Sequence, residues 1–262
     1  MLQFFEKLGG LTLYHVNQAG RMGMFLLSSL LCVFTPPYKI SPIIKQIHMI
    51  GALSVFVILF TGGFTGMVLG LQGHATLSKF GAEGLLGSAV ALSLIRELGP
   101  VLTALMVTGR AGSAICAEVG IMRISEQIDA LDCMAIDPHK FIMAPKFVAG
   151  IISMPLLTSL FDVMGILGGY VVGVGLLKGN EGAYFASMYD SVGFKDIYMG
   201  LMKSFTFGLL IIWICSCKGF FVHMQRKASF GAEGVSRVTT SAVVLTSVAI
   251  LVFDYFVTSI LL

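Results

Sequence analysis

Five long apolar segments constrain the fold of this chain more than any other feature. They cover residues 47–71, 82–122, 141–177, 197–221 and 236–262. A helix of about 20 apolar residues is long enough to cross the hydrocarbon core of a bilayer. Only 12% of the 262 residues are charged, whereas an ordinary soluble domain has roughly 25%. The sequence therefore predicts an all-α integral membrane protein in which residues 1–262 form a single domain.

The first 35 residues contain an apolar run that is too short to cross a membrane. Residues 22–34 would extend ~20 Å as a helix, whereas the hydrocarbon core is ~30 Å thick. Apolar and polar residues mix before this run, which is typical of a helix lying in the membrane interface. No small-residue cleavage site follows it, so a signal peptide is not favoured. We expect residues 1–35 to form an interfacial helix that the mature protein retains.

Other classes of function find little support in the composition. The formal net charge is only +3, and no basic tract suggests a nucleic-acid partner. Four of the five cysteines lie in apolar runs, where a thiol acts as a small packing residue. Cys215 and Cys217 are close in sequence, but no acid or histidine accompanies them. The five histidines show no i, i+4 pair, so we predict no metal site.

Two of the apolar segments carry a glycine at every fourth position. These glycines are Gly62, Gly66 and Gly70 in the first segment and Gly165, Gly169 and Gly173 in the third. In lipid, such spacing lets another helix approach closely, because close packing must supply the attraction between helices. The partner could be a helix of the same chain or of a second copy. We favour packing within the chain.

The second and third segments are longer than a single crossing requires. Residues 82–122 would extend ~60 Å as one helix, about twice the hydrocarbon thickness. Gly99 and Pro100 should bend this helix, because proline removes a backbone donor and crowds the preceding turn. Pro145 and Pro155 should divide the third segment into an approach and the crossing itself.

The distribution of lysine and arginine predicts the orientation. One set of connections holds Lys39, Lys45, Arg123, Lys140, Lys146, Arg226, Lys227 and Arg237, and the other holds only Lys79, Lys178 and Lys195. Cytoplasmic loops carry the excess of positive charge. With five crossings, the N-terminus is then cytoplasmic, the C-terminus is on the outer side, and residues 125–138 face the cytoplasm.

Residues 125–138 form an acidic segment between the second and third crossings. Four acids fall within it, and apolar residues recur at helical spacing from Ile124. Ser125 can begin a helix and Asp137–Pro138 can end it, which predicts an amphipathic helix over 125–136. It could be a plain surface helix, a helix lying on the bilayer, or a helix that fits a groove on a soluble partner. The residues alone leave these three readings open.

At this point the sequence resembles a known family. The segments EQIDALDCMAIDP (126–138), IRELGPVLTALMVTGRAGSAICAEVG (95–120) and GAEGVSRVTTSAVV (231–244) are similar to those of MlaE/YrbE-type permeases. These proteins are the membrane subunits of lipid-transporting ABC systems in bacteria with two membranes. The resemblance covers nearly the whole chain in the right order.

The resemblance implies a transporter whose energy comes from a separate ATPase. The cytoplasmic helix would dock on that subunit through Glu126, Ile128, Asp129, Leu131, Asp132 and Met134. The chain would form a homodimer in the inner membrane, with two ATPase subunits beneath and periplasmic MCE-domain proteins above, and phospholipid would be the substrate. The dipeptide Gly-Lys is absent, so the chain has no Walker A loop. We therefore predict a non-enzymatic subunit without a cofactor, and ATP and Mg²⁺ would be used by the partner.

Several charged residues lie at bilayer depth, where each costs at least ~2.5 kcal/mol on insertion scales. They could pair across helices and fix the bundle, or they could line a cavity for a lipid headgroup. The candidate cavity residues are Glu97, Lys203 and Asp254, supported by Arg96 and Asp162. Arg96 and Glu97 cannot face one partner, because adjacent helical residues point ~100° apart.

Two other functions compete with lipid transport. An ion-coupled secondary carrier would use the buried carboxylates Glu97, Asp162 and Asp254 as proton or sodium sites. Its transport would follow an ion gradient without any ATPase. A membrane scaffold that transports nothing would tolerate charge reversal at Glu97.

Overall fold

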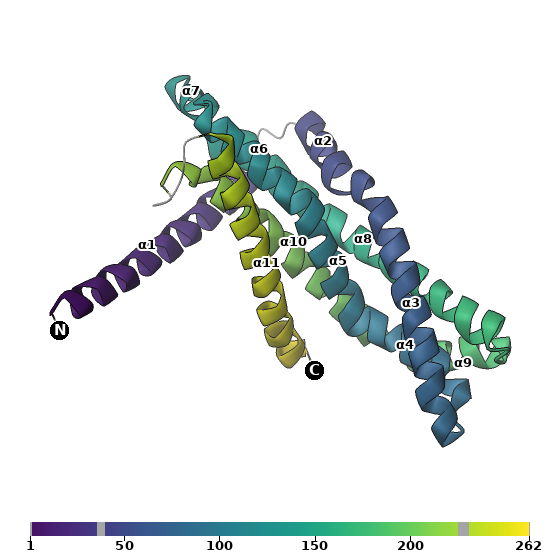
Figure 1. The fold of residues 1–262 in the computed structure, drawn as a ribbon. Helices are drawn as coiled ribbons and strands as arrows, with labels where there is room; N and C mark the ends of the chain where they lie inside the picture. The colour runs from purple at the N-terminus through teal and green to yellow at the C-terminus, as the bar shows by residue number, and fades with distance from the viewer. Residues whose placement is uncertain (1, 36–39, 225–230, 262) are drawn as a thin grey trace.

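The computed structural model describes residues 2–35, 40–224 and 231–261, and over these residues the regular structure is helical (Figure 1). The α-helices are α1 (Leu2–Val33), α2 (Ile40–Ile50), α3 (Val55–Leu77), α4 (Leu86–Ser93), α5 (Gly99–Val107), α6 (Ser113–Ile124), α7 (Gln127–Cys133), α8 (Ala144–Tyr170), α9 (Glu181–Ser191), α10 (Phe194–Phe220) and α11 (Ala232–Leu261). Short 3₁₀ and π turns join several of them into longer rods.

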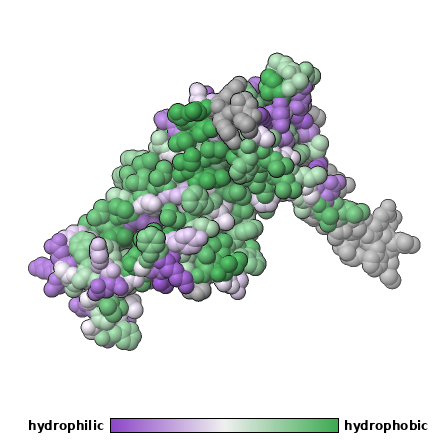
Figure 2. Space-filling view, turned by 180° about the vertical axis from the view of Figure 1, so that it is seen from behind, coloured by the Kyte–Doolittle hydropathy of each residue, from purple (hydrophilic) through white to green (hydrophobic). Residues whose placement is uncertain are grey.

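Five of these rods are long and apolar enough to cross a membrane, which confirms the predicted all-α membrane fold. They run over Ile40–Phe80, Glu83–Ile124, His139–Leu176, Phe194–Phe220 and Ala232–Leu261. One face of the molecule carries a broad apolar band, and its hydrophilic side chains gather mainly towards the two ends (Figure 2). This is the pattern of a bundle whose middle lies in lipid.

The bend expected at Gly99 and Pro100 stays a prediction, but the second rod does contain two π turns, Leu94–Leu98 and Thr108–Gly112. The first lies directly before Gly99 and Pro100. The Gly99 amide donates to the carbonyl of Leu94, five residues earlier, and Pro100 has no amide hydrogen to restore the α-helical pattern. The prediction that Pro155 divides the third rod is wrong, because α8 continues through it from Ala144 to Tyr170.

The glycines of the first and third rods face each other, which confirms packing within the chain. A Cβ atom on Gly66 would overlap the carbonyl oxygen of Gly165, and one on Gly62 would lie 2.8 Å from the carbonyl oxygen of Phe161. Gly70 meets Gly169 in the same way. Because the paired positions rise together along both helices, α3 and α8 run parallel. Their backbones approach closely over about two and a half turns, from Gly62 to Gly70.

The first rod is broken between α2 and α3, and a charged side chain from the second rod covers the break. The Gly51 amide donates to Ile47 O at 2.7 Å, and a 3₁₀ turn follows over Ala52–Ser54. A guanidinium N–H of Arg110 donates to the carbonyl of Met49. A cation at the C-terminal end of a helix is favourable because the free carbonyls carry partial negative charge.

Helix α1 is docked on the bundle at its C-terminal half, and its N-terminal end projects away from the bundle (Figure 1). Phe25 and Ser29 are buried, and the indole N–H of Trp213 donates to Met22 O at 2.9 Å. On the other side, Leu27 and Leu31 are exposed. The interfacial position of residues 1–35 stays a prediction that this exposed apolar side supports.

The basic residues counted for orientation lie at opposite ends of the bundle. The described members of the predicted cytoplasmic set, among them Arg123 and Lys140, lie near α7, and Lys79, Lys178 and Lys195 lie near the ends joined by α9. Lys39, Arg226 and Lys227 fall outside the described residues. The orientation itself stays a prediction.

Candidate functional site

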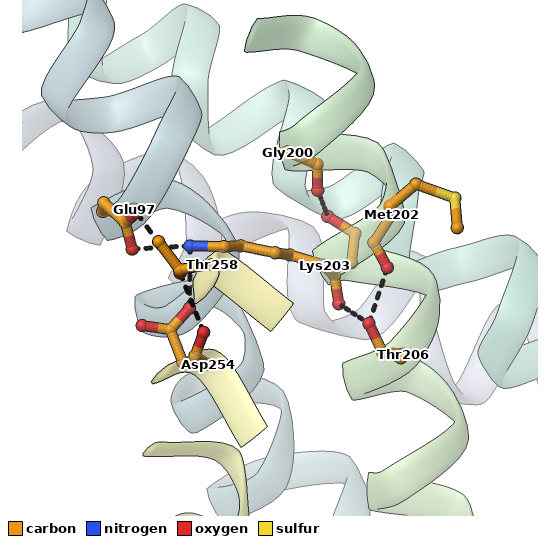
Figure 3. Close-up of polar contacts among 8 residues, drawn as sticks. Glu97, Gly200, Met202, Lys203, Thr206, Asp254 and Thr258 are labelled. Atoms are coloured by element: carbon orange, nitrogen blue, oxygen red, sulfur yellow. Dashed lines mark hydrogen bonds and ion pairs between the residues drawn. The ribbon is translucent and has the colours of Figure 1, made fainter. Parts of the chain in front are cut away.

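A buried lysine joins three rods of the bundle (Figure 3). Lys203 on α10 contacts Glu97 of the first π turn, with Nζ 2.5 Å from Oε2, and Asp254 of α11, with Nζ 2.9 Å from Oδ1. The first contact is also a hydrogen bond. The second is an ion pair only, since Asp254 Oδ1 has no hydrogen-bond partner among the described residues. We call Glu97, Lys203, Asp254 and Thr258 the Lys203 centre.

Thr258 links the two carboxylate residues of this centre. Its hydroxyl donates to the Asp254 carbonyl oxygen at 2.8 Å and lies 3.4 Å from Glu97 Oε1. Thr258 was not among the residues predicted from the sequence. The available signal was its position four residues after Asp254, which places the two side chains on one face of α11.

Burial differs sharply within the centre. The Lys203 side chain is 0% exposed, whereas the side chains of Glu97 and Asp254 are 43% and 20% exposed. A buried ammonium is stable only if it is paired, so the two carboxylates hold Lys203 in place. The formal charges of one ammonium group and two carboxylate groups sum to −1. The atoms that a ligand would meet first are therefore carboxylate oxygens, with the ammonium behind them.

The centre lies towards the end of the bundle that carries α9. Lys203 is nine residues from the start of α10 and Asp254 is seven residues from the end of α11. At 1.5 Å per residue these separations are ~14 Å and ~11 Å along the helices. If the predicted orientation is right, the centre lies in the outer half of the membrane.

Arg96 and Glu97 face different partners, as the helical geometry predicted. Arg96 Nη2 lies 2.7 Å from Asp196 Oδ1 on the first turn of α10. Asp196 also accepts the Gly193 amide at 2.8 Å and so caps α10. Asp196 was not predicted, because nothing in the sequence links it to Arg96, 100 residues away. Arg96 thus ties the π turn to α10 beside the Lys203 centre, without joining it.

Asp162 lies apart from the Lys203 centre, on the α8 side of the π turn. Its Oδ1 is buried without a hydrogen-bond partner among the described residues, and it lies against Gly99, where any Cβ would overlap it. The residue lines an open cavity of about 190 Å³ between α8 and α10, together with Ile95 and Ser204. Of the five predicted cavity residues, the structure therefore brings together Glu97, Lys203 and Asp254.

The acidic segment contains a shorter helix than predicted. Helix α7 covers only Gln127–Cys133. The prediction that Ser125 begins it is wrong, because the Ser125 hydroxyl donates to Ile121 O at 2.8 Å and so closes α6. Glu126 then adopts a left-handed backbone with φ of 58°, which turns the chain into α7. Asp137 accepts the His139 amide at 2.8 Å and so leads into the next rod.

The predicted docking residues of this segment do not share one environment. Ile128 is fully buried in its own chain, where it anchors α7. Asp129 is half exposed and forms an ion pair with Arg123 at 2.7 Å. Leu131 is partly buried, and the remaining residues Glu126, Asp132 and Met134 are exposed. A partner would therefore meet mainly the last group.

Metal binding finds no support in the described part of the chain, where no group of three or more histidine, cysteine, aspartate or glutamate side chains could hold an ion. The arrangement suits a different chemistry. A charged centre with a buried cation and two accessible carboxylates can bind a polar headgroup, and the apolar helix faces around it can contact acyl chains.

Comparison with known proteins gives consistent results. Residues 43–260 match the family described as Permease MlaE. The chain is 40% identical to the intermembrane phospholipid transport system permease protein MlaE of Haemophilus influenzae, over 100% of this chain and 98% of that protein. It is 40% identical to a probable ABC transporter permease protein of Rickettsia bellii, over 98% and 97% of the two chains. It is also 32% identical to protein TRIGALACTOSYLDIACYLGLYCEROL 1, chloroplastic, of Arabidopsis thaliana, over 82% of this chain and 60% of that protein.

Proposed function

The chain belongs to the MlaE permease family and is a membrane permease of ABC type, and we propose that it moves phospholipid between the inner and outer membranes, driven by ATP hydrolysis on a separate subunit. The observation that carries the proposal is the Lys203 centre, a charged group held at bilayer depth by three rods. Its full-length relative in Haemophilus influenzae is named for phospholipid transport.

The chemistry of the Lys203 centre fits a phospholipid headgroup. The accessible oxygens of Glu97 and Asp254 can accept hydrogen bonds from headgroup ammonium or hydroxyl donors. Lys203 has three N–H donors, and a phosphate that displaces one carboxylate would meet the ammonium behind it. Such an exchange keeps the buried cation paired throughout, so it avoids the penalty of an unpaired charge.

A homodimer would complete the cavity. Helix α11 carries Asp254 and is the least buried of the five rods. Only 11% of the residues in its apolar stretch are buried, against 56% for α10. Apolar residues such as Val248, Leu251 and Val252 are exposed along it. A second copy facing α11 would enclose the Lys203 centre between two apolar walls.

The remaining partners follow from the same proposal. Two ATPase subunits would bind the cytoplasmic face through the exposed residues of the acidic segment, and ATP and Mg²⁺ would act there. MCE-domain proteins would cover the opposite face. The permease would lie in the inner membrane with its N-terminus in the cytoplasm and its C-terminus in the periplasm.

The test is lipid transfer by the complex purified from its native membrane. The complex should contain an ATPase and should transfer a labelled phospholipid from proteoliposomes to acceptor vesicles only when ATP is present. The Glu97→Lys variant should lose transfer because it places a second cation beside Lys203. Transfer that follows an ion gradient in the absence of an ATPase would contradict the proposal and favour a secondary carrier.

A double variant and a matched control test whether the ATPase docks on the acidic segment. Asp132→Lys combined with Met134→Ser changes two exposed residues of the acidic segment and should release the ATPase during purification. Glu233→Lys, an exposed acid on α11, is the matched control and should retain it. Retention of the ATPase by the double variant would show that docking lies elsewhere.

A further inference from the structure

We infer that Phe220 and helix α10 carry the movement of the acidic segment to the Lys203 centre. The inference rests on the proposed function, because it assumes that an ATPase moves the acidic segment. It concerns how that movement reaches the charged residues in the membrane, and it depends on a group of contacts at the cytoplasmic end of the bundle.

Residues that flank the acidic segment on both sides contact one aromatic ring, that of Phe220. Arg123 precedes the segment, and its guanidinium carbon lies 5.4 Å from the centroid of the Phe220 ring. His139 follows the segment, and its ring centroid lies 5.4 Å from that of Phe220. A guanidinium over an aromatic face and paired rings at this distance are attractive contacts. Residues 125–138 thus leave and rejoin the bundle beside Phe220, the last residue of α10.

Arg123 also holds helix α7 itself. Its Nη1 donates to Asp129 Oδ1 at 2.7 Å, and its Nε donates to His223 Nδ1 at 3.2 Å. Asp129 belongs to α7, and His223 lies just beyond α10. A displacement of α7 would therefore pull on a side chain that contacts Phe220 at the end of α10 and His223 in the turn that follows it.

Helix α1 adds the ring of Phe25 to the same group of contacts. The Phe25 ring lies 5.1 Å from His139, 5.4 Å from Phe220 and 6.0 Å from Phe221. Phe25 is buried, and the neighbouring Ser29 lies 3.2 Å from His139 Nδ1. Phe25, His139 and Phe220 therefore contact one another, so Phe220 packs both against the residue that follows the acidic segment and against α1.

Two routes lead from this group to the Lys203 centre, and they differ in continuity. Helix α10 runs without interruption from Phe194 to Phe220, and Lys203 lies 17 residues before Phe220, or ~26 Å along the helix. The route from Arg123 to Glu97 along the second rod passes the π turn Thr108–Gly112 and ends in another. An unbroken, buried helix moves as one body, whereas a π turn is a point of altered hydrogen bonding that can yield.

The test uses the complete complex with its ATPase. It compares each variant with a control in which the same substitution is made at another position. Phe220→Leu removes the ring but keeps an apolar side chain, and Phe205→Leu on the exposed side of α10 is its control. Arg123→Gln removes the ion pair with Asp129, and Arg237→Gln removes the exposed ion pair with Glu233 as its control. Each variant is measured for bound ATPase, ATP hydrolysis and phospholipid transfer.

We expect Phe220→Leu and Arg123→Gln to keep the ATPase and its hydrolysis, while phospholipid transferred per ATP falls roughly tenfold, a typical coupling effect. Both controls should transfer normally. Normal transfer by Phe220→Leu and Arg123→Gln would overturn the inference, and so would loss of the bound ATPase, because the residues would then serve docking. Absence of ATP-driven transfer in the unaltered complex would overturn the proposed function and remove the basis of this inference with it.

Discussion

The two helix pairs α3–α8 and α10–α11 are held together by different means. Between α3 and α8, glycine backbones touch, and a Cβ on Gly66 or Gly168 would overlap the carbonyl of the facing helix. Between α10 and α11, a buried ammonium is held by carboxylates from α11 and from the π turn. The first contact depends on shape alone and has no state that a ligand or a proton could change. The second depends on charge and can be rearranged.

The difference indicates which part of the bundle is fixed and which part can move. Close backbone packing is lost steeply with small separations, so α3 and α8 should stay together throughout any cycle. Ion pairs can exchange partners with an incoming headgroup as long as the buried cation remains paired.

Removing the negative charges of Glu97 and Asp254, the two partners of Lys203, should have the largest effect on stability. The double variant Glu97→Gln and Asp254→Asn leaves a fully buried ammonium without a counter-charge, which should lower the free energy of unfolding by about 3 to 5 kcal/mol. The partial exposure of Glu97 favours the lower end. Lys203→Met removes the buried charge itself and should cost less. Thermal unfolding in detergent measures both, and equal melting of the double variant and the unaltered protein would refute the pairing.

A methyl group at the glycine interface should have the next largest effect. Gly66→Ala forces α3 and α8 apart and should cost about 1 to 3 kcal/mol as overpacking. Gly63→Ala is the matched control, because a Cβ at Gly63 meets nothing within 4 Å. The two variants should differ clearly in melting temperature in the same detergent. A similar melting temperature for both would mean that the close approach of α3 and α8 is not maintained.

A charge contact outside the bilayer should have a smaller, pH-dependent effect. Burial lowers the pKa of His223, and the positive charge of Arg123 lowers it further. At neutral pH, His223 is therefore uncharged in the folded chain, where Nδ1 accepts a hydrogen bond from Arg123. Below the unfolded pKa of about 6.5, the unfolded chain binds the proton first, so stability falls as the pH drops further. His223→Asn keeps an acceptor without a titrating group and should show a shallower fall in melting temperature from about pH 7.5 to about pH 5.5. Equal slopes would contradict this assignment.

The smallest effect is expected at the exposed pair of α11. Arg237 and Glu233 form an i, i+4 ion pair at 2.6 Å, and both side chains are more than half exposed. Such pairs contribute about 0.5 kcal/mol or less. Arg237→Gln should therefore leave the melting temperature nearly unchanged. A clear loss of stability would show that this part of α11 is covered by another subunit, which would place charge-based contacts at that interface too.

Much of the architecture could be predicted because its cause is local in sequence. Apolar runs of sufficient length predicted the five crossings, and the glycine spacing predicted a close helix contact within the chain. The cost of a charge in lipid singled out Glu97, Lys203 and Asp254, which the structure brings together. That they bind a headgroup stays a prediction.

Other features could not be predicted because they depend on contacts distant in sequence. The pairing of Arg96 with Asp196 and the reach of Arg110 to Met49 require the helices to be placed first. The second π turn, Thr108–Gly112, contains no proline that would have indicated it in the sequence. The acidic segment was predicted as one amphipathic helix. In the structure, Ile128 is buried against its own chain and Asp129 forms an ion pair with Arg123, so these two residues stabilise the chain itself.

The π turn Leu94–Leu98 sets Glu97 apart from its two charged partners. A π turn holds one residue more than the α-helical turn that it replaces. Rewinding it would swivel the residues on one side by about 100° relative to those on the other, since each residue of an α-helix advances by that angle. Glu97 lies within this turn, whereas Lys203 and Asp254 lie on uninterrupted helices. A single change of winding would thus swing one carboxylate away from the ammonium and leave the other in place.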